Sequence, residues 1–417
     1  ILGVSMTRFG KLLDKSLKDL AYEPVWSAID ESKIDPHDID IAFAGNAYAG
    51  LITGQESIRG QVLLREAGIT RIPIINVENA CASGSTAFYL AHRAVAAGQA
   101  DVALALGVEK LFCDDTGKSL KALSSSSDLD IEGRMGMLFA GIYAMRVRGH
   151  MERYGLTREQ LAKVAVKNHD HGALNPHSQY RNRVTVEEVL NSRMIADPIT
   201  LQMTCPLGDG GAAVLIGTRE MALRMDKRPV RIGSSVLGSF GFTRKDEPSI
   251  VERVAQKAYA EAGVKPGDVQ VAELHDAVAP VELLLYEQLG FCGPGESGRM
   301  IDERVPWFDG KLPVNTSGGL TAKGHPAGAT GISQVGEIVW QMRGEAGERQ
   351  IHPFPNVGLA QNGGGNVAGE TAVVAGGYTN TASAMRSTVG GGYQNIAGGW
   401  GSTVPGGQFN EATGIAS

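Results

Sequence analysis

The first 110 residues alternate between patterns typical of helices and patterns typical of short buried strands. Residues 17–31 carry apolar side chains at helical spacing, whereas residues 39–45, 73–77 and 101–107 are short β-rich runs. A chain of this kind packs helices against the faces of a sheet, because each element alone leaves an apolar side uncovered. The pattern therefore predicts an α/β fold with a largely parallel sheet.

The second half of the chain repeats this scheme. We expect strands at residues 230–233, 271–274 and 371–375, and helices at residues 250–262, 280–289 and 331–343. The similarity is one of topology only, since no residue-level repeat is present. We therefore predict an internal duplication, with an N-terminal half at residues 1–220 and a C-terminal half at residues 221–375. Residues 111–201 are irregular in pattern and form an insertion of the kind that usually covers a site.

The tail, residues 376–417, contains a true sequence repeat. Gly376-Gly377-Tyr378 recurs as Gly391-Gly392-Tyr393, and Gly406-Gly407 follows at the same interval of 15 residues. The tail resembles the β-roll repeats of bacterial surface adhesin heads, and a flexible glycine-rich extension is the alternative. Both interpretations remain open. Three units with so few aliphatic residues cannot bury a core alone, so an ordered roll needs another copy to stack on.

Charge and hydropathy exclude several classes of function. The chain has 39 basic and 45 acidic residues, a net charge of -6, and no block of like charge that could follow a phosphate backbone, so no nucleic-acid partner is expected. No apolar run approaches the roughly 18 residues that cross a bilayer, and the first residues lack the features of a secretory leader. We therefore expect a cytoplasmic protein without membrane association. The four cysteines are far apart and form no CxxC pair, which argues against a metal site or a disulfide scaffold.

Cys81 is the strongest candidate for a nucleophile. It lies in Asn79-Ala80-Cys81-Ala82-Ser83-Gly84, where a predicted strand gives way to a predicted helix. A thiol at the N-terminal end of a helix feels the positive end of the helix dipole and nearby free amide groups, which favour the thiolate. The alternative is a buried cysteine that fills a tight turn, and this segment alone does not decide between the two.

Two histidines of the C-terminal half have surroundings suited to catalysis. His325 lies in Gly324-His325-Pro326, where glycine permits a sharp turn and proline stiffens the loop before the next helix. Imidazole is the usual base for activating a thiol. His275 follows the predicted strand 271–274, at the edge where open α/β proteins place their sites, and could donate to an oxyanion or hold a water molecule that does. A structural role remains open for each.

A glycine-rich turn, Asn362-Gly363-Gly364-Gly365, precedes the last predicted strand. Its amide groups could form an anion cradle, because successive exposed N–H groups attract negative charge. A plain linker is the alternative interpretation.

Taken together, these four segments resemble the thiolase family. The Cys81 segment, His275-Asp276-Ala277, Gly324-His325-Pro326 and the turn at 362–365 occur in that family's order and approximate spacing, and the resemblance covers about residues 1–375. It is closest to the branch of sterol-carrier-protein-type thiolases and their bacterial and archaeal relatives, in which His-Asp replaces the Asn-Glu of biosynthetic thiolases.

The resemblance implies a duplicated βαβαβαββ fold in five layers, αβαβα, that assembles at least as a homodimer. It implies that Cys81 is acylated, that His325 activates Cys81 and lines an oxyanion hole, and that His275 positions a water molecule there. The backbone amides of Cys81 and Gly364 would bind the thioester oxygen. Coenzyme A would lie over the 111–201 insertion as a co-substrate, with no cofactor permanently bound.

One departure from the family pattern bears on the reaction. Most thiolases carry a second cysteine, in the last glycine-rich turn or just after the His-Asp pair, that shuttles the proton of the carbon nucleophile. This chain has Asn362 and Ala277 at those places, and Cys113, Cys205 and Cys292 fall on no matching motif. Acyl transfer is unaffected by this loss, whereas carbanion chemistry then needs a histidine, a water molecule or a changed reaction.

Some relatives with His-Asp-Ala work with a small OB-fold, zinc-ribbon subunit. Other relatives, which have fewer of the catalytic residues, are aldolases. The retained Cys81 favours a thiolase-type acyltransferase that cleaves a 3-oxoacyl-CoA with coenzyme A. Retro-aldol cleavage of a 3-hydroxyacyl-CoA and a non-catalytic acyl-CoA-binding subunit are the alternatives. Met135, Met137 and Phe139, with Asn362, suggest an adaptable apolar substrate pocket, and plain packing explains the first three equally well. The acyl group and the direction of reaction are not defined by the sequence.

Overall fold

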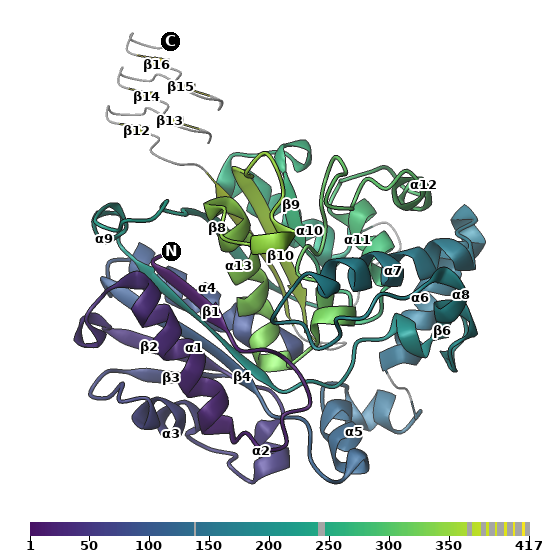
Figure 1. Ribbon diagram of the computed structural model, residues 1–417, viewed down its shortest axis with the longest axis horizontal. Helices are drawn as coiled ribbons and strands as arrows, with labels where there is room; N and C mark the ends of the chain where they lie inside the picture. The colour runs from purple at the N-terminus through teal and green to yellow at the C-terminus, as the bar shows by residue number, and fades with distance from the viewer. Residues whose placement is uncertain are drawn as a thin grey trace.

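The computed structural model describes residues 1–136, 139–240, 247–364 and 369–376, and five two-residue strands of the tail. Two β-sheets form the body of the protein, with helices between them and on their outer faces (Figure 1). One sheet is built from the first half of the chain and the other from the second half.

The first sheet has five strands in the order β1-β7-β4-β2-β3. Their bounds are β1 (Gly3–Met6), β2 (Ile41–Gly45), β3 (Ile74–Val77), β4 (Val102–Glu109) and β7 (Gly210–Gly217). β2, β3 and β4 are parallel, but β7 is antiparallel to both β1 and β4. Strands β1, β2, β3 and β4 therefore point the same way and β7 alone runs against them, so the expectation of a largely parallel sheet is confirmed. The connection after β4 returns the chain to the end where β4 finished, so Gly210 lies opposite Glu109 and the pairing is antiparallel.

The second sheet repeats this arrangement in the order β8-β11-β10-β9. Its strands are β8 (Ile232–Ser239), β9 (Val271–Glu273), β10 (Val357–Gly363) and β11 (Gly369–Gly376). β11 is antiparallel to β8 and β10, and β10 is parallel to β9. A parallel bridge joins Ala272 of β9 to Val314. Val314 thus lies beside β9 in the second sheet at the place that corresponds to β3, beside β2, in the first sheet. The two halves thus share strand order and direction, which confirms the predicted duplication of topology.

Two helices, one from each half, lie between the sheets. They are α4 (Ser83–Ala96) and α13 (Ala327–Arg343), and their apolar side chains share one core with residues of both sheets. The helices approach closely because they meet at glycines. A Cβ atom on Gly84 would lie 2.4 Å from the carbonyl oxygen of Gly328, and one on Gly331 would lie 2.6 Å from the Cβ atom of Ser85. This close approach brings the beginnings of the two helices together.

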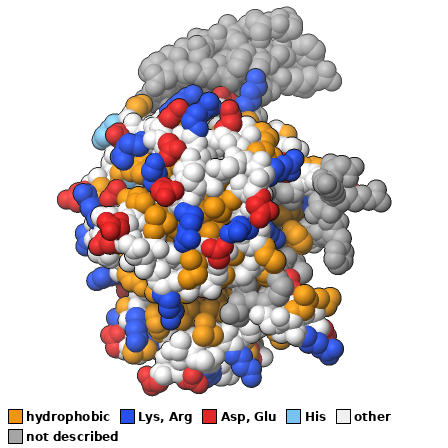
Figure 2. Space-filling model, turned by 90° about the vertical axis from the view of Figure 1, so that its right-hand side faces the viewer, with side chains coloured by type: hydrophobic (Ala, Val, Ile, Leu, Met, Phe, Trp, Pro, Cys, Tyr) orange, Lys and Arg blue, Asp and Glu red, His pale blue; other side chains and the backbone are white. Residues whose placement is uncertain are grey.

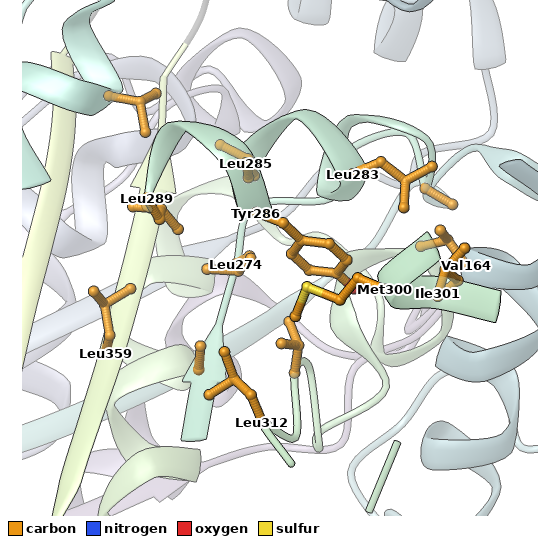
Figure 3. Packing of buried hydrophobic residues seen from close by; sticks show 14 of the residues in the cluster. Val164, Leu274, Leu283, Leu285, Tyr286, Leu289, Met300, Ile301, Leu312 and Leu359 are labelled. Atoms are coloured by element: carbon orange, nitrogen blue, oxygen red, sulfur yellow. The ribbon is translucent and has the colours of Figure 1, made fainter. Parts of the chain in front are cut away.

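The outer faces of both sheets are covered by helices. The first sheet packs against α1 (Leu17–Ser32) and α3 (Arg59–Glu66), and the second against α10 (Ile250–Ala262) and α11 (Val281–Gln288). Figure 3 shows Leu285 of α11 and Leu289, which directly follows that helix, in one cluster with Leu274, which follows β9, and Leu359 of β10. Counting the central pair, the order of layers is αβαβα, which confirms the predicted fold.

The segment between β4 and β7 forms a cover over the second half. It contains α5 (Thr116–Ser124), a π-helical turn (Leu129–Gly133), α6 (Phe139–Tyr154), α7 (Arg158–Ala173), α8 (Val186–Asn191), β5 (Met194–Ala196) and β6 (Ile199–Thr200). α6 and α7 pack against α11, and α7 also packs against α12 (Ser297–Asp302). On this side of the molecule, hydrophobic side chains are exposed between charged groups (Figure 2). Among the described residues, the two remaining α-helices are short: α2 (Ala49–Thr53) and α9 (Arg219–Leu223).

The described part of the tail contains two parallel ladders. β12 (Thr381–Ala382), β14 (Ile396–Ala397) and β16 (Glu411–Ala412) form one, and β13 (Thr388–Val389) and β15 (Thr403–Val404) form the other. Each sequence repeat thus adds one rung to a ladder, as in a parallel β-solenoid. Apart from Gly376 at the end of β11, the other residues of the predicted 376–417 tail lie outside the described residues, and its likeness to adhesin heads stays a prediction. Within the described parts of the chain, no helix has both the length and the apolar character to span a membrane.

Candidate active site

Cys81 lies in a strained turn between β3 and α4. A short 3₁₀ helix (Ala80–Ala82) joins the two elements, and Ala80 adopts a φ of 46°, which is uncommon for a residue with a side chain. Hydrogen bonds hold the turn: the amide of Asn79 donates to the hydroxyl of Ser83 over 2.9 Å, and this hydroxyl donates to the carbonyl of Ala80 over 2.7 Å. The predicted passage from strand to helix is confirmed, and the turn leaves Cys81 on the wall of a cavity.

The hydroxyl of Tyr48 lies 3.8 Å from the sulfur of Cys81 and also bonds to Ser126. Burial raises the pKa of Tyr48 well above its usual value, and the proximity of Cys81 raises it further, so the phenol stays neutral. Sequence reasoning did not find Tyr48, because it precedes α2, far from Cys81 in the chain.

The loop before α13 fixes the orientation of the His325 ring. Gly324 has a φ of 107°, which requires glycine, and the chain enters α13 two residues after His325. Nδ1 of His325 lies 2.7 Å from the hydroxyl of Thr330, which itself donates to the carbonyl of Pro326 over 3.0 Å. Since a hydroxyl has one hydrogen, Thr330 must accept from Nδ1–H. Nε2 of His325 then carries a free lone pair.

His325 is suited to act as a neutral base. Its Nε2 is buried and has no hydrogen-bond partner among the described residues. Burial lowers the pKa of His325 well below its usual value, and the nearby His275 and Lys323 lower it further. A neutral imidazole with an unused lone pair can accept the proton of a thiol.

His275 presents the opposite tautomer. It follows β9, its backbone amide donates to the side chain of Gln361, and its Nδ1 accepts from Nδ2 of Asn362 over 3.1 Å. The hydroxyl of Ser85 lies 3.0 Å from the carbonyl of Ala82 and 3.1 Å from Oδ1 of Asn362, and donation of its one hydrogen to the amide oxygen fits this orientation. Nε2 of His275 therefore carries the hydrogen and can donate it to a substrate oxygen. Burial lowers the pKa of His275 to about 4, so the ring is neutral at pH 7.

The fold brings Cys81, His275 and His325 together from both halves of the chain. The sulfur and one nitrogen of each ring lie within 4.8 Å of one another, and the rings meet edge to face with centroids 5.1 Å apart. One thiolate and two imidazoles could also hold a zinc ion, and this is the only such set of ligands within the described ranges. A metal there would occupy both nucleophile and base, and the expectation of a metal-free site stays a prediction.

Gly364 lies directly against the Cys81 turn. A Cβ atom at this position would lie 2.5 Å from the carbonyl oxygen of Asn79 and 3.0 Å from the amide nitrogen of Ala82. Only glycine allows this approach, which places the backbone of Gly364 beside the nucleophile as the resemblance implies. Gly365, the last residue of the predicted cradle, lies outside the described residues.

The cavity at this site has a volume of about 720 Å³ and a mainly apolar wall. Besides the three residues of the cluster, Phe139 and Tyr143 of α6 and Leu120 of α5 line it. Met135, in contrast, is 69% exposed and is not part of the wall, and Met137 lies outside the described residues. Asn362 stands behind His275 and orients it, rather than lining the cavity. The 111–201 segment thus supplies much of the wall, as expected of an insertion that covers a site.

Asp276 connects the two histidine loops. Its carboxylate accepts from the amide of Leu320 over 2.7 Å and from the hydroxyl of Thr321 over 2.6 Å, in the segment that leads to His325. Burial raises the pKa of Asp276 to about 7, and the charge of Glu282 contributes in the same direction. No sequence signal reveals this role, since the bonded residues are 44 and 45 positions apart.

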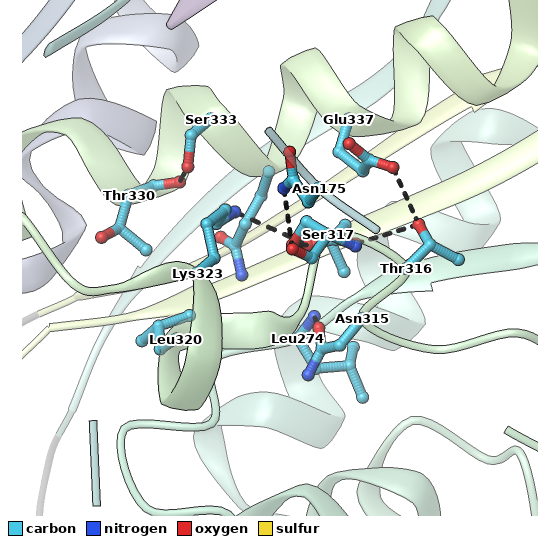
Figure 4. A network of polar contacts seen from close by, with 12 residues as sticks. Asn175, Leu274, Asn315, Thr316, Ser317, Leu320, Lys323, Thr330, Ser333 and Glu337 are labelled. Atoms are coloured by element: carbon cyan, nitrogen blue, oxygen red, sulfur yellow. Dashed lines mark hydrogen bonds and ion pairs between the residues drawn. The ribbon is translucent and has the colours of Figure 1, made fainter. Parts of the chain in front are cut away.

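A buried polar network also holds the segment that leads to His325. Glu273 of β9 accepts from the backbone amide and hydroxyl of Ser317 and lies 3.8 Å from Nζ of Lys323. Thr316 donates to Glu337 of α13 over 3.2 Å, as Figure 4 shows. Residues 315–323 are thereby attached to both β9 and α13, which fixes where the His325 loop begins.

Replacing Thr330 with valine should lower kcat by about 100-fold, because His325 loses the acceptor that sets its tautomer and position. The KM for coenzyme A, the co-substrate that the resemblance implies, should change little, since Thr330 is buried and does not line the cavity. Steady-state kinetics and a thermal melt measure these effects. Thr330→Ser keeps the hydroxyl and should retain most of the activity; equal activity of the valine variant would show that the bond has no positioning role.

Replacing Gly364 with alanine should slow acylation by about 10²-fold to 10³-fold, because the added methyl group displaces the Cys81 turn and the amide expected to bind the thioester oxygen. Stopped-flow acylation with an acyl-CoA measures the rate, and circular dichroism confirms that the fold persists. Gly267→Ala is the matched control, since a Cβ atom there meets nothing within 4 Å. An unchanged acylation rate in Gly364→Ala would contradict the assignment.

Two family models match long stretches of the chain. The model "Thiolase, N-terminal domain" matches residues 1–220, and "Thiolase C-terminal domain-like" matches residues 246–377. The chain belongs to the thiolase family. The resemblance found in the sequence is therefore confirmed.

Individual relatives agree with this family. The chain is 41% identical to an acetyl-CoA acetyltransferase of Methanothermobacter thermautotrophicus, over 90% of this chain and 97% of that protein. It is 34% identical to sterol carrier protein 2 of Rattus norvegicus, over 93% of this chain and 73% of that protein. These relatives confirm the predicted enzyme class, a thiolase-type acyltransferase. Among solved structures, the Ltp2-ChsH2(DUF35) aldolase has a TM-score of 0.76 at 26% identity, covering 90% of this chain and 97% of that chain.

Proposed function

We propose that this thiolase cleaves a 3-oxoacyl-CoA with coenzyme A through an acyl-enzyme on Cys81. The observation that carries the proposal is the cluster of Cys81, His275 and His325 on the wall of one cavity. A nucleophile, a base with a free lone pair and a hydrogen-bond donor are the three parts that acyl transfer requires.

The first half-reaction follows from the two tautomers. Nε2 of His325 accepts the proton of the Cys81 thiol, and the thiolate attacks the 3-keto carbon of the substrate. The oxygen that becomes negative takes a hydrogen bond from Nε2–H of His275, or from a water molecule that His275 holds, and from the amides of Cys81 and Gly364. The bond between C2 and C3 then breaks, and the electron pair stays on C2.

In the second half-reaction, coenzyme A takes the acyl group from Cys81. The thiol of coenzyme A loses its proton to a base in the site and attacks the thioester carbonyl, which returns Cys81 as thiolate. Coenzyme A is a co-substrate here, and no resident cofactor takes part in any step. The apolar wall of the cavity suits a fatty, steroid side-chain or aromatic acyl group.

We propose that the protein assembles with at least one partner subunit. A homodimer is supported by β3, an edge of the first sheet where Ile75 is 38% exposed, because an open strand edge can pair with a second copy. A small OB-fold, zinc-ribbon subunit is a second candidate partner, supported by the likeness to the Ltp2-ChsH2(DUF35) aldolase. We place the protein in the cytoplasm.

The same likeness makes aldol cleavage of a 3-hydroxyacyl-CoA a second candidate reaction. That reaction needs no cysteine nucleophile, whereas Cys81 is retained in a strained turn beside a free base. The local geometry therefore supports the thiolase reaction better than the aldolase reaction.

Intact-mass measurement tests the proposal. The protein is incubated with a panel of acyl-CoAs without free coenzyme A, and tryptic peptides locate any adduct. We expect one acyl group on the Cys81 peptide, which disappears when coenzyme A is added. A protein that cleaves a 3-hydroxyacyl-CoA and forms no adduct would overturn the proposal in favour of the aldolase reaction.

A further inference from the structure

Cys205 lines the same cavity as Cys81. All four cysteines lie in described parts of the chain, and the cavity wall includes these two but neither Cys113 nor Cys292. Cys113 faces the carbonyl of Asp115, and Cys292 packs against the outer core of the second half. The cavity therefore contains two sulfur atoms, although the sequence motifs account for only one.

The backbone places Cys205 directly opposite Ala277. Thr204 and Val278 form an antiparallel bridge, the amide of Cys205 donates to the carbonyl of Ala277 over 3.0 Å, and the amide of Ala279 donates to the carbonyl of Met203. In such a pair, side chains directly opposite share one face, with Cβ atoms about 4.5–5.5 Å apart. A side chain at Cys205 therefore reaches the space beside Ala277.

The same segment also contacts the loop of the catalytic base. Leu207 forms a parallel bridge with His325, so residues 204–207 run between the loop of His275 and that of His325. Both rings line the cavity together with Cys205. Nε2 of His325 is buried and has no hydrogen-bond partner in the part of the chain that the structure describes, which leaves a proton acceptor at the same cavity.

From this placement, and resting on the proposed function, we propose that the Cys205 thiol gives its proton to C2 of the leaving enolate in cleavage and takes it back in the reverse direction. Cys205 would thus be a catalytic residue, in contact with the reacting carbon. Its position opposite Ala277 supplies the sulfur that the chain lacks after its His-Asp pair.

The step balances in atoms and charge. When the C2–C3 bond breaks, its electron pair forms the enolate of the departing acyl-CoA, and C2 takes the hydrogen of the Cys205 S–H bond. Cys205 is left as a thiolate, and the thiol of the incoming coenzyme A reprotonates it. The coenzyme A thiolate so formed attacks the acyl group on Cys81, and the leaving sulfur returns as the Cys81 thiolate. No oxidant, metal or further reactant is needed.

The surroundings keep Cys205 protonated until it is used. Burial raises the pKa of the Cys205 thiol, and the proximity of Cys81 and of Asp276 raises it further. A protonated thiol is the form needed to quench an enolate, and the thiolate left behind is a strong enough base to be reprotonated at once.

The experiment moves the thiol from position 205 to position 277, which lies opposite it. Cys205→Ser, Cys205→Ala and the double variant Cys205→Ala/Ala277→Cys are compared with the wild type, and Cys292→Ala is the matched control outside the cavity. Three readouts are taken: the acyl adduct on Cys81 by mass, thiolysis of acetoacetyl-CoA, and incorporation of deuterium from D₂O at C2 of acetyl-CoA.

We expect both single Cys205 variants to form the Cys81 adduct at a rate near that of the wild type. In both variants the rates of thiolysis and of deuterium exchange at C2 should fall by about 10²-fold or more. In the double variant, both rates should be at least about tenfold higher than in Cys205→Ala. The serine variant keeps the size of the side chain, so a loss shared with it does not come from misfolding. Full thiolysis and exchange in both single variants would overturn the inference and leave the acyl-enzyme intact. A wild type without the adduct would overturn the proposed function itself.

Discussion

Cys81→Ala will lower kcat/KM for thiolysis of a 3-oxoacyl-CoA by about 10⁴-fold or more and will abolish the acyl adduct. The reason is that Cys81 alone provides the atom that carries the acyl group between the two half-reactions. Binding of coenzyme A should persist, because most of the cavity wall comes from other residues. A spectrophotometric assay of thioester cleavage and equilibrium binding of coenzyme A measure the two effects separately.

Cys113→Ala is the control for this variant. Cys113 is partly buried, and its sulfur bonds to Asp115 and Ser119 instead of lining the cavity, so turnover should stay close to that of the wild type. The outcome that would reject the acyl-enzyme is full activity of Cys81→Ala. Carbon–carbon cleavage in that variant, with a 3-hydroxyacyl-CoA as substrate, would identify the aldolase reaction instead.

His325→Asn will slow acylation of Cys81 by about 10²-fold to 10⁴-fold, because the thiol loses the base that accepts its proton. The pKa of His325 lies well below its usual value, so the imidazole is unprotonated at neutral pH and can act as the base there. Removing the imidazole therefore removes an active base at this pH. Rapid-quench measurement of the acyl-enzyme gives the rate. Raising the pH should restore part of it in the variant, since the thiol then ionises without a base.

His37→Asn is the matched control, because its side chain is 94% exposed and lies outside the site. It should acylate as fast as the wild type. If His325→Asn acylated at the wild-type rate and pH profile, another group would have to act as the base, and the assigned tautomers of the two rings would be wrong.

Helix α10 shows where local sequence is sufficient. Its predicted bounds, 250–262, agree with the structure, because Ser249 and Glu252 form a capping box at the start and Gly263 ends the helix in a left-handed conformation. Helix α13 begins four residues before its predicted start at 331. All of its residues except Trp340 and Arg343 are buried, so the first turn has no amphipathic pattern to reveal it.

Strands β1 and β10 are among the strands that the sequence pattern does not reveal. β1 has only four residues, and β10 carries Gln361 and Asn362 just before its last residue, polar side chains that are not typical of a buried strand. In the structure, Gln361 accepts from the backbone of His275 and Asn362 bonds to its ring. The polar end of β10 thus belongs to the site, where function departs from the pattern that local structure would favour.

The amino-acid sequence by itself determined the fold class, the duplication and the identity of the cluster Cys81, His275 and His325, because these depend on local patterns and short motifs. The tertiary structure decided which nitrogen of each imidazole faces the substrate and that Cys205 lies opposite Ala277. The reason is physical: a tautomer and a cross-strand neighbour are set by partners that can be distant in the chain, as Asn362 and Cys205 are, and only folding brings them within hydrogen-bonding distance.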